Sequence, residues 1–235
     1  GARRRDRRVR KENEGTMAIT SKDVQRLREA TGAGMMDCKR ALESTGGDFD
    51  GAVTWLREKG MASAAKRVGR TAAEGAVASY IHMGGKIGVL VEVNCETDFV
   101  ARTDDFQAFC KDICLQIASQ APRYVQREDV PADVLERERQ IALAQARENA
   151  QGKPENVLQR IADGRLNKWY QEACLLEQAF VKDPDKTIEQ LAKEISGKVG
   201  EKVVVRRFVR YQLGEGIERR QSDLAAEVAA AIGDK

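Results

Sequence analysis

The sequence lacks the side chains and motifs on which most catalytic sites depend. Its 235 residues include one histidine, His82. The phosphate-binding patterns GxxxxGK[ST] and GxGxxG are absent, and so is a CxxC pair. No apolar run approaches the roughly 18 residues needed to span a bilayer, which predicts a soluble protein that does not enter a membrane. These absences argue against an enzyme and give no reason to expect a cofactor.

The five cysteines lack the spacing of a disulfide framework. In the absence of a secretory signal they predict reduced thiols in a cytoplasmic protein. Cys110 and Cys114 are four residues apart, as metal ligands on one helical face can be. Both fall on the apolar stripe of an expected helix, however, and His82 is the only histidine. We therefore expect these thiols in the core and expect no metal site.

The net charge of +3 is concentrated at the N-terminus. Residues 1–16 hold seven Lys and Arg against three Asp and Glu, a net of +4, so the remaining chain carries 3 − 4 = −1. A neutral body lacks the electrostatic footprint of a nucleic-acid-binding domain. The expected partner is therefore a protein or a small molecule, with no direct nucleic-acid contact.

The basic leader, residues 1–16, has no apolar h-region, so it is not a secretory signal. Met17 precedes a capped helix and is a candidate start. The leader is then either a remnant of cloning or an upstream extension. A basic run can bind RNA, but a disordered tail is the favoured interpretation, and we exclude the leader from the fold.

Residues 17–60 have the pattern of a three-helix, ubiquitin-associated-like module. A first helix starts at a cap near residue 20, a second covers residues 35–44, and a third runs from Asp48 to Gly60. Each is broken from the next by glycines. A module of this size depends on tethering to a larger body, and residues 61–75 are the expected linker.

Residues 76–213 have the pattern of an α+β core domain. Strand-like runs cover residues 76–82 and 87–93, joined by a Met-Gly-Gly-Lys turn, and residues 202–211 supply a third strand. An amphipathic helix over residues 104–120 is expected to lie on the apolar face of this three-stranded antiparallel sheet.

Two longer helices, over residues 131–150 and 155–170, predict a hairpin that protrudes from the core. Such a hairpin is either structural or an arm for docking or dimerisation. Residues 214–235 predict a C-terminal helical module, whose amphipathic helix carries Leu224 and Val228 and follows a glycine hinge. That helix could dock on a partner or on its own core.

Asp98 and Phe99 lie where the second strand passes into the helix over residues 104–120. Connecting segments run over the surface and are usually polar, so a phenylalanine here predicts a wedge offered to a partner. Glu92, Glu96 and Asp98 could instead provide an acid–base pair. Because no Ser/His set or metal ligands accompany them, binding is the favoured interpretation.

Met35 and Met36 provide a second apolar contact. Adjacent helical residues cannot both face the core fully, so one methionine is left for a contact surface, a role that its pliable side chain suits. The C-terminal helix provides a third contact. Three apolar anchors on a neutral body predict an extended protein–protein interface.

Several segments resemble bacterial elongation factor Ts. Residues 31–42, TGAGMMDCKRAL, resemble its N-terminal module, and residues 94–101, NCETDFVA, resemble its signature. Gly200-Glu201-Lys202 and Arg206-Arg207 resemble its final core strand, and residues 214–228 resemble its C-terminal module. The resemblance covers about residues 18–232.

The resemblance implies a guanine-nucleotide exchange factor for elongation factor Tu in translation elongation. It implies that Asp98 and Phe99 enter the partner's GTPase domain, where the aromatic ring wedges near the magnesium site and GDP leaves. Thr97 and Val100 shape that corner. Further partner contacts are expected at Met35, Met36, Leu224 and Val228.

In one respect the chain departs from longer relatives, which carry two core subdomains with separate sheets. This chain has strands for one core subdomain. Residues 80–91 look like the hairpin of the second subdomain, merged with the signature of the first subdomain. Short members of the family make up the difference by dimerising, so we expect a homodimer with two elongation factor Tu molecules. The merger also puts His82 in the place of a partner-contacting histidine.

Two other functions remain to be weighed against exchange. The three-helix module could serve a peptide-binding or RNA-binding adaptor, which would leave GDP release from elongation factor Tu unchanged. A carboxylate enzyme would lose turnover in Glu96→Gln, whereas an exchange factor would be affected mildly.

Overall fold

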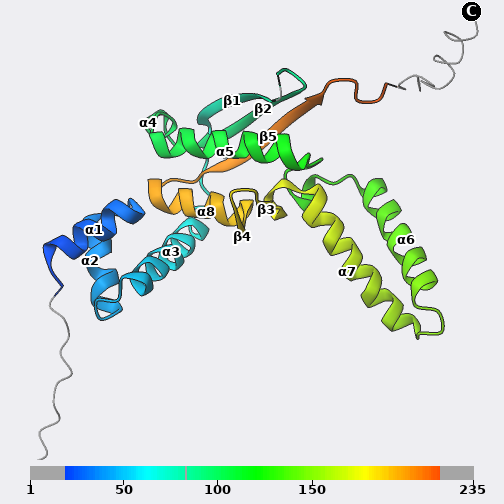
Figure 1. Cartoon of the computed structure of the whole chain (residues 1–235), viewed down its shortest axis with the longest axis horizontal. Helices are drawn as coiled ribbons and strands as arrows, with labels where there is room; N and C mark the ends of the chain where they lie inside the picture. The colour runs from blue at the N-terminus through cyan, green and yellow to red at the C-terminus, as the bar shows by residue number, and fades with distance from the viewer. Residues whose placement is uncertain (1–18, 83, 218–235) are drawn as a thin grey trace, which may run out of the picture.

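The computed structural model describes residues 19–82 and 84–217, and Figure 1 shows the order of its elements. The described part opens with α1 (Ser21–Thr31), α2 (Met35–Ser44) and α3 (Phe49–Ala65). Thr20 starts α1 with a capping box, in which its hydroxyl accepts from the Asp23 N–H and the Asp23 carboxylate accepts from the Thr20 N–H. The expected three helices are confirmed. Their shared core includes Leu27, Cys38, Leu42 and Ala52.

The third helix is longer than its sequence indicated. The prediction that it ends at Gly60 is wrong, because α3 continues to Ala65 and its second half packs against α8 (Ile188–Val199). Gly60 faces Gly197 there, so closely that a Cβ on Gly197 would stand 2.8 Å from the Gly60 Cα. Gly60 therefore serves close helix packing and does not end the helix.

The core contains a three-stranded antiparallel sheet in the order β1-β2-β5, as expected. Its strands are β1 (Glu74–His82), β2 (Ile87–Cys95) and β5 (Val204–Gln212). The helix α5 (Asp104–Gln120) packs on β1 and β2, and α8 lies beside α5 (Figure 1). α8 thus contacts both the core helix α5 and the N-terminal helix α3.

The two faces of this sheet have different surroundings. Val89, Val91 and Val93 of β2 are buried in the cluster that includes α5 and α8. On the opposite face, large apolar side chains remain exposed to solvent. This outer sheet face is formed by Val77, Ile81, Leu90, Val209 and Tyr211.

A bulge in β5 lies opposite Glu92. Glu92 pairs with Arg207, whereas Val93 pairs with Val205, so Arg206 is the extra residue. Both arginines donate to the Glu92 carboxylate at 2.7 Å. The Arg206 and Arg207 hydrogen bonds lower the pKa of Glu92 to about 2.

The helices α6 (Ala132–Asn149) and α7 (Glu155–Ala173) pack together and extend away from the sheet, as Figure 1 shows. This arrangement confirms the protruding helical hairpin. The sequence did not reveal the short elements on either side of this hairpin. η1 (Arg127–Asp129) precedes α6, and η2 (Leu175–Glu177), β3 (Ala179–Phe180) and β4 (Asp183–Thr187) lie between α7 and α8.

The α+β fold class is confirmed for the part of the chain that the structure describes. The basic leader and the C-terminal helix with Leu224 and Val228 lie outside the described residues. None of the helices described between residues 19 and 217 combines the length and apolar character required to cross a membrane.

Candidate functional site

The Asp98–Phe99 corner is a single helical turn, α4 (Asp98–Ala101), that follows directly on β2. Phe99 is 77% exposed, whereas Ala101 is buried and Val100 packs against the core. Because successive helical residues turn by about 100°, one short turn directs the first two side chains outward and the next two inward. The exposed aromatic ring expected from the sequence is therefore present, on a turn attached to the core.

Asp98 lies beside this ring at the solvent-exposed surface. Its carboxylate accepts from the Arg102 guanidinium at 2.6 Å, four residues further along. Both side chains are substantially exposed, and ion pairs of this kind contribute at most about 1 kcal/mol. Asp98 can therefore leave Arg102 for a group on a partner at little cost.

Thr97 caps α4 and ties it to a distant loop. Its hydroxyl accepts from the Val100 N–H at 3.4 Å and donates to a carboxylate oxygen of Glu201 at 2.7 Å. The other oxygen of Glu201 accepts from the N–H groups of Glu96 and Thr97 at 3.1 and 3.0 Å. Sequence reasoning noticed Glu201 within a family-like stretch but could not place it here, because the contact spans 104 residues.

Met35 and Met36 occupy the first turn of α2. The sequence suggested that one of the two would be available for contact. Both are available, because they are 43% and 64% exposed. The inward positions of α2 are taken by Cys38, Ala41 and Leu42 instead. Figure 1 places α2 and α4 toward the same end of the molecule, on the left in that view.

His82 lies away from the Asp98–Phe99 corner. Glu74 at the start of β1 pairs with Cys95, next to the corner, whereas His82 pairs with Ile87 at the turn of the hairpin. Eight residue-to-residue steps along β1 separate the two ends, roughly 27 Å. A 2.8 Å hydrogen bond joins His82 Nδ1 to the Tyr80 hydroxyl. The structure therefore does not bring His82 together with the corner.

The carboxylates considered for acid–base chemistry are engaged in ion pairs. Arg206 and Arg207 hold Glu92, as described above. The backbone N–H of Lys202 donates to Glu96 at 2.7 Å, and with the nearby Arg70 guanidinium it lowers the pKa of Glu96. Both groups stay ionised at neutral pH and cannot act as general acids.

Cys110 and Cys114 are buried in the core, as expected. Burial raises the pKa of Cys110 to about 12 and that of Cys114 to about 11, which keeps both as unreactive thiols. Among the described residues, no group of three or more His, Cys, Asp and Glu side chains is placed to hold a metal ion.

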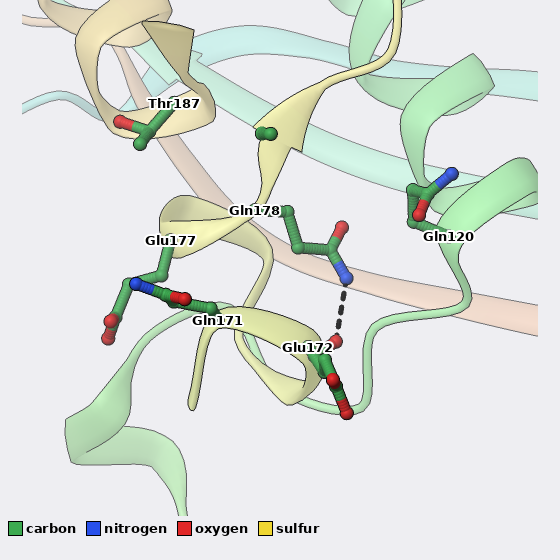
Figure 2. Close-up of a pocket in the computed structure, with 7 residues that line it drawn as sticks. Gln120, Gln171, Glu172, Glu177, Gln178 and Thr187 are labelled. Carbon is green, nitrogen blue, oxygen red and sulfur yellow. Dashed lines mark hydrogen bonds between the residues drawn. The ribbon is translucent and has the colours of Figure 1, made fainter. Parts of the chain in front are cut away.

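A hollow of about 440 Å³ lies apart from the corner, between the ends of α5 and α7 and the strand β3. Figure 2 shows its polar lining, where Gln178 donates to the Glu172 carbonyl at 2.8 Å. Gln178 also accepts from Gln116 at 3.1 Å. Because this buried amide is satisfied within the protein, the hollow contains no unpaired Gln178 group that would call for a ligand.

Comparison with known proteins identifies the family of the chain. A family model described as elongation factor TS matches residues 21–215. The chain belongs to the elongation factor Ts family. It is 61% identical over 217 residues to elongation factor Ts of Geobacter sulfurreducens, covering 92% of this chain and 100% of that protein. It is 59% identical over 214 residues to elongation factor Ts of Desulforamulus reducens, covering 91% and 98%.

Membership of the elongation factor Ts family establishes the function in outline. The chain is a cytoplasmic guanine-nucleotide exchange factor that binds elongation factor Tu in translation elongation. It is not an enzyme, since exchange makes and breaks no covalent bond. The adaptor and carboxylate-enzyme alternatives are thereby set aside.

Proposed function

We propose that Asp98 and Phe99 form a wedge that enters the GTPase domain of elongation factor Tu near its magnesium and phosphate site. The observation that supports this most strongly is Phe99 itself, 77% exposed on an anchored turn. A large apolar ring in water gains free energy when a partner buries it. The partner's GDP site then loosens because the ring occupies space that the GDP-bound form requires.

The size of the wedge effect follows from the area that Phe99 can bury. Complete burial of a phenylalanine contributes roughly 1.5–3 kcal/mol, and most of the ring is available here. Each tenfold gain in release rate requires about 1.4 kcal/mol. Phe99 therefore accounts for about one to two decades of acceleration, and further gain requires Asp98, loss of Mg²⁺ and the rest of the interface.

Exchange by this route is reciprocal. A factor that weakens GDP binding by a given ratio must itself be bound more weakly, by the same ratio, when GDP is present. Phe99→Ala should consequently narrow the difference between the affinities for nucleotide-free and GDP-bound elongation factor Tu.

Further contacts to elongation factor Tu are proposed outside the corner. Met35 and Met36 are exposed and suit a second contact with the GTPase domain. His82, at the far end of β1, and Leu224 and Val228, outside the described residues, stay predictions from the resemblance.

The wedge is tested by stopped-flow release of fluorescent GDP from elongation factor Tu. We expect Phe99→Ala and Asp98→Ala each to lower the maximal release rate, with circular dichroism spectra unchanged. Ile141→Ala, on α6, is a matched control because it also truncates an exposed apolar side chain. Release at the wild-type rate by Phe99→Ala would refute the wedge.

We also propose that the chain is a homodimer joined through the outer sheet face. Antiparallel sheets with one packed face usually present polar residues on the other, but this face carries Val77, Ile81, Leu90, Val209 and Tyr211. Sheets with apolar faces pack against one another about 10 Å apart. A second copy supplies an equally apolar face through a two-fold axis.

The dimer is tested by light scattering at micromolar concentration. We expect a mass near twice the 26.0 kDa of one chain, and we expect Leu90→Lys to give the single-chain mass. Met36→Lys, which places the same charge on an exposed residue elsewhere, should leave the dimer intact. A wild-type protein that remains at 26.0 kDa would overturn this proposal.

A further inference from the structure

The corner that carries Phe99 is held from a distance by the loop that follows α8. Glu201 in that loop uses both carboxylate oxygens on the corner. One accepts from the N–H groups of Glu96 and Thr97, at 3.1 and 3.0 Å, and the other accepts from the Thr97 hydroxyl at 2.7 Å. Glu201 thus fixes the last residues before α4 in three places.

The contact is reciprocal. The Glu96 carboxylate accepts from the Lys202 N–H at 2.7 Å, so each segment donates backbone N–H groups to a carboxylate of the other. We call this pair of interactions the 96–201 clamp. The Ser196 hydroxyl donates to the Glu201 carbonyl, which ties the clamp to the end of α8.

The clamp acts on the direction of Phe99 through Thr97. Because the Thr97 hydroxyl gives its proton to Glu201, a lone pair of its oxygen faces the Val100 N–H and caps α4. The backbone of Thr97 is fixed at the same time. Loss of Glu201 would leave these half-buried donors without their acceptor and release the turn that carries the ring.

We propose that Glu201 is a positioning residue for nucleotide exchange, which holds α4 so that Phe99 meets elongation factor Tu in one orientation. This inference rests on the proposed wedge. Glu201 acts through Thr97 and does not itself contact the nucleotide site. Its effect on exchange is therefore bounded by the loss of the two wedge side chains on that turn, Asp98 and Phe99.

The test is a double-mutant cycle of Glu201→Ala and Phe99→Ala, measured as the maximal GDP release rate at saturating exchange factor. We expect Glu201→Ala to lower that rate about tenfold, with a change of less than about threefold in the half-saturating concentration. In the Phe99→Ala background the same substitution should have a clearly smaller effect, because the ring is already missing and only Asp98 on the same turn remains to be displaced.

A role in general stability predicts a different pattern. Destabilisation lowers the active fraction, which raises the apparent half-saturating concentration and leaves the maximal rate unchanged. That pattern for Glu201→Ala, or fully independent effects of the two substitutions on the maximal rate, would overturn the inference. Glu177→Ala is the matched control, since it removes a carboxylate paired with Arg127 far from the corner. It should leave the release rate unchanged.

Two conservative variants keep the test decisive if Glu201→Ala does not fold. Glu201→Gln retains an acceptor for the two N–H groups, and we expect release within about threefold of wild type. Glu201→Asp retracts the carboxylate by one methylene, so its maximal GDP release rate should lie between those of Glu201→Gln and Glu201→Ala.

The outcomes separate this inference from the wedge proposal. If Phe99→Ala releases GDP at the wild-type rate, the wedge and the inference both fail. If Phe99→Ala slows release and Glu201→Asp and Glu201→Ala do not, only the role of Glu201 is refuted.

Discussion

The contact between Gly60 and Gly197 predicts a sharp difference between two otherwise identical substitutions. Both glycines lie within helices, α3 and α8, so replacement by alanine adds the same helix preference of about 1 kcal/mol to each variant. A Cβ on Gly60 would stand 3.8 Å from the Gly197 Cα, an ordinary contact. A Cβ on Gly197 would stand 2.8 Å from the Gly60 Cα and 3.0 Å from its carbonyl carbon and oxygen.

The magnitude follows from that overlap. Carbon atoms pack best at about 3.5–4.0 Å, so Gly197→Ala must separate the two helices by about 1 Å. Overpacking of this kind costs about 1–3 kcal/mol. Because the helix term cancels between the variants, Gly60→Ala should exceed Gly197→Ala in free energy of unfolding by about 1–3 kcal/mol.

Urea unfolding followed by circular dichroism measures this difference. Gly164→Ala on α7 is a suitable reference, since a Cβ there meets nothing within 4 Å. The free energy of unfolding of Gly164→Ala should exceed that of the wild type by up to about 1 kcal/mol, from the higher helix preference of alanine alone. Equal midpoints for Gly60→Ala and Gly197→Ala would refute the packing argument. Because α3 carries the N-terminal module with Met35 and Met36, Gly197→Ala should also slow GDP release.

Three further predictions concern charge and contact. The pKa of Glu92 is lowered from 4.5 to about 2, so its ion pairs stabilise the protein fully above about pH 4.5 and are lost as the pH falls toward 2. In thermal melts the wild-type protein should therefore have a higher Tm than Glu92→Gln at neutral pH and the same Tm near pH 2. Met36→Ala should weaken binding to nucleotide-free elongation factor Tu up to about fivefold by calorimetry, and Met35→Ala, which is less exposed, should weaken it less. Glu96→Gln retains an acceptor for the Lys202 N–H and should change the GDP release rate by less than about threefold; abolished exchange would contradict the ion-pairing role given to this carboxylate.

Much of the fold follows from local patterns. Helical periodicity predicted α2 and α5 with the bounds observed, because their buried and capping residues are close in sequence. The alternation of Val89, Val91 and Val93 predicted the packed face of the sheet. Phe99 was predicted as exposed because it lies in a connecting segment, and such segments run over the surface.

The features that sequence reasoning missed depend on contacts between distant segments. Gly60 has the pattern of a helix stop, and only Gly197 on α8 explains why the helix continues. Glu201 lies in a loop with no local partner, so its three hydrogen bonds to the corner leave no local signal. The single turn α4 is shorter than the periods from which helices are recognised.

The same limit applies to the outer sheet face. In β1, small inward residues such as Ala76 and Ala78 alternate with the outward Val77. Apolar residues on both faces give no alternation between polar and apolar positions, so the pattern predicts a strand without indicating that its second face is free. The proposed dimer therefore rests on the structure more than on the sequence.

The most direct test of the account is the rate of GDP release from elongation factor Tu in the presence of saturating Phe99→Ala. We predict a rate about one to two decades below that of the wild-type factor. The rate with Phe99→Leu should lie between those two rates, because leucine retains part of the apolar side chain. Wild-type release by Phe99→Ala would contradict the claim that this exposed ring drives exchange.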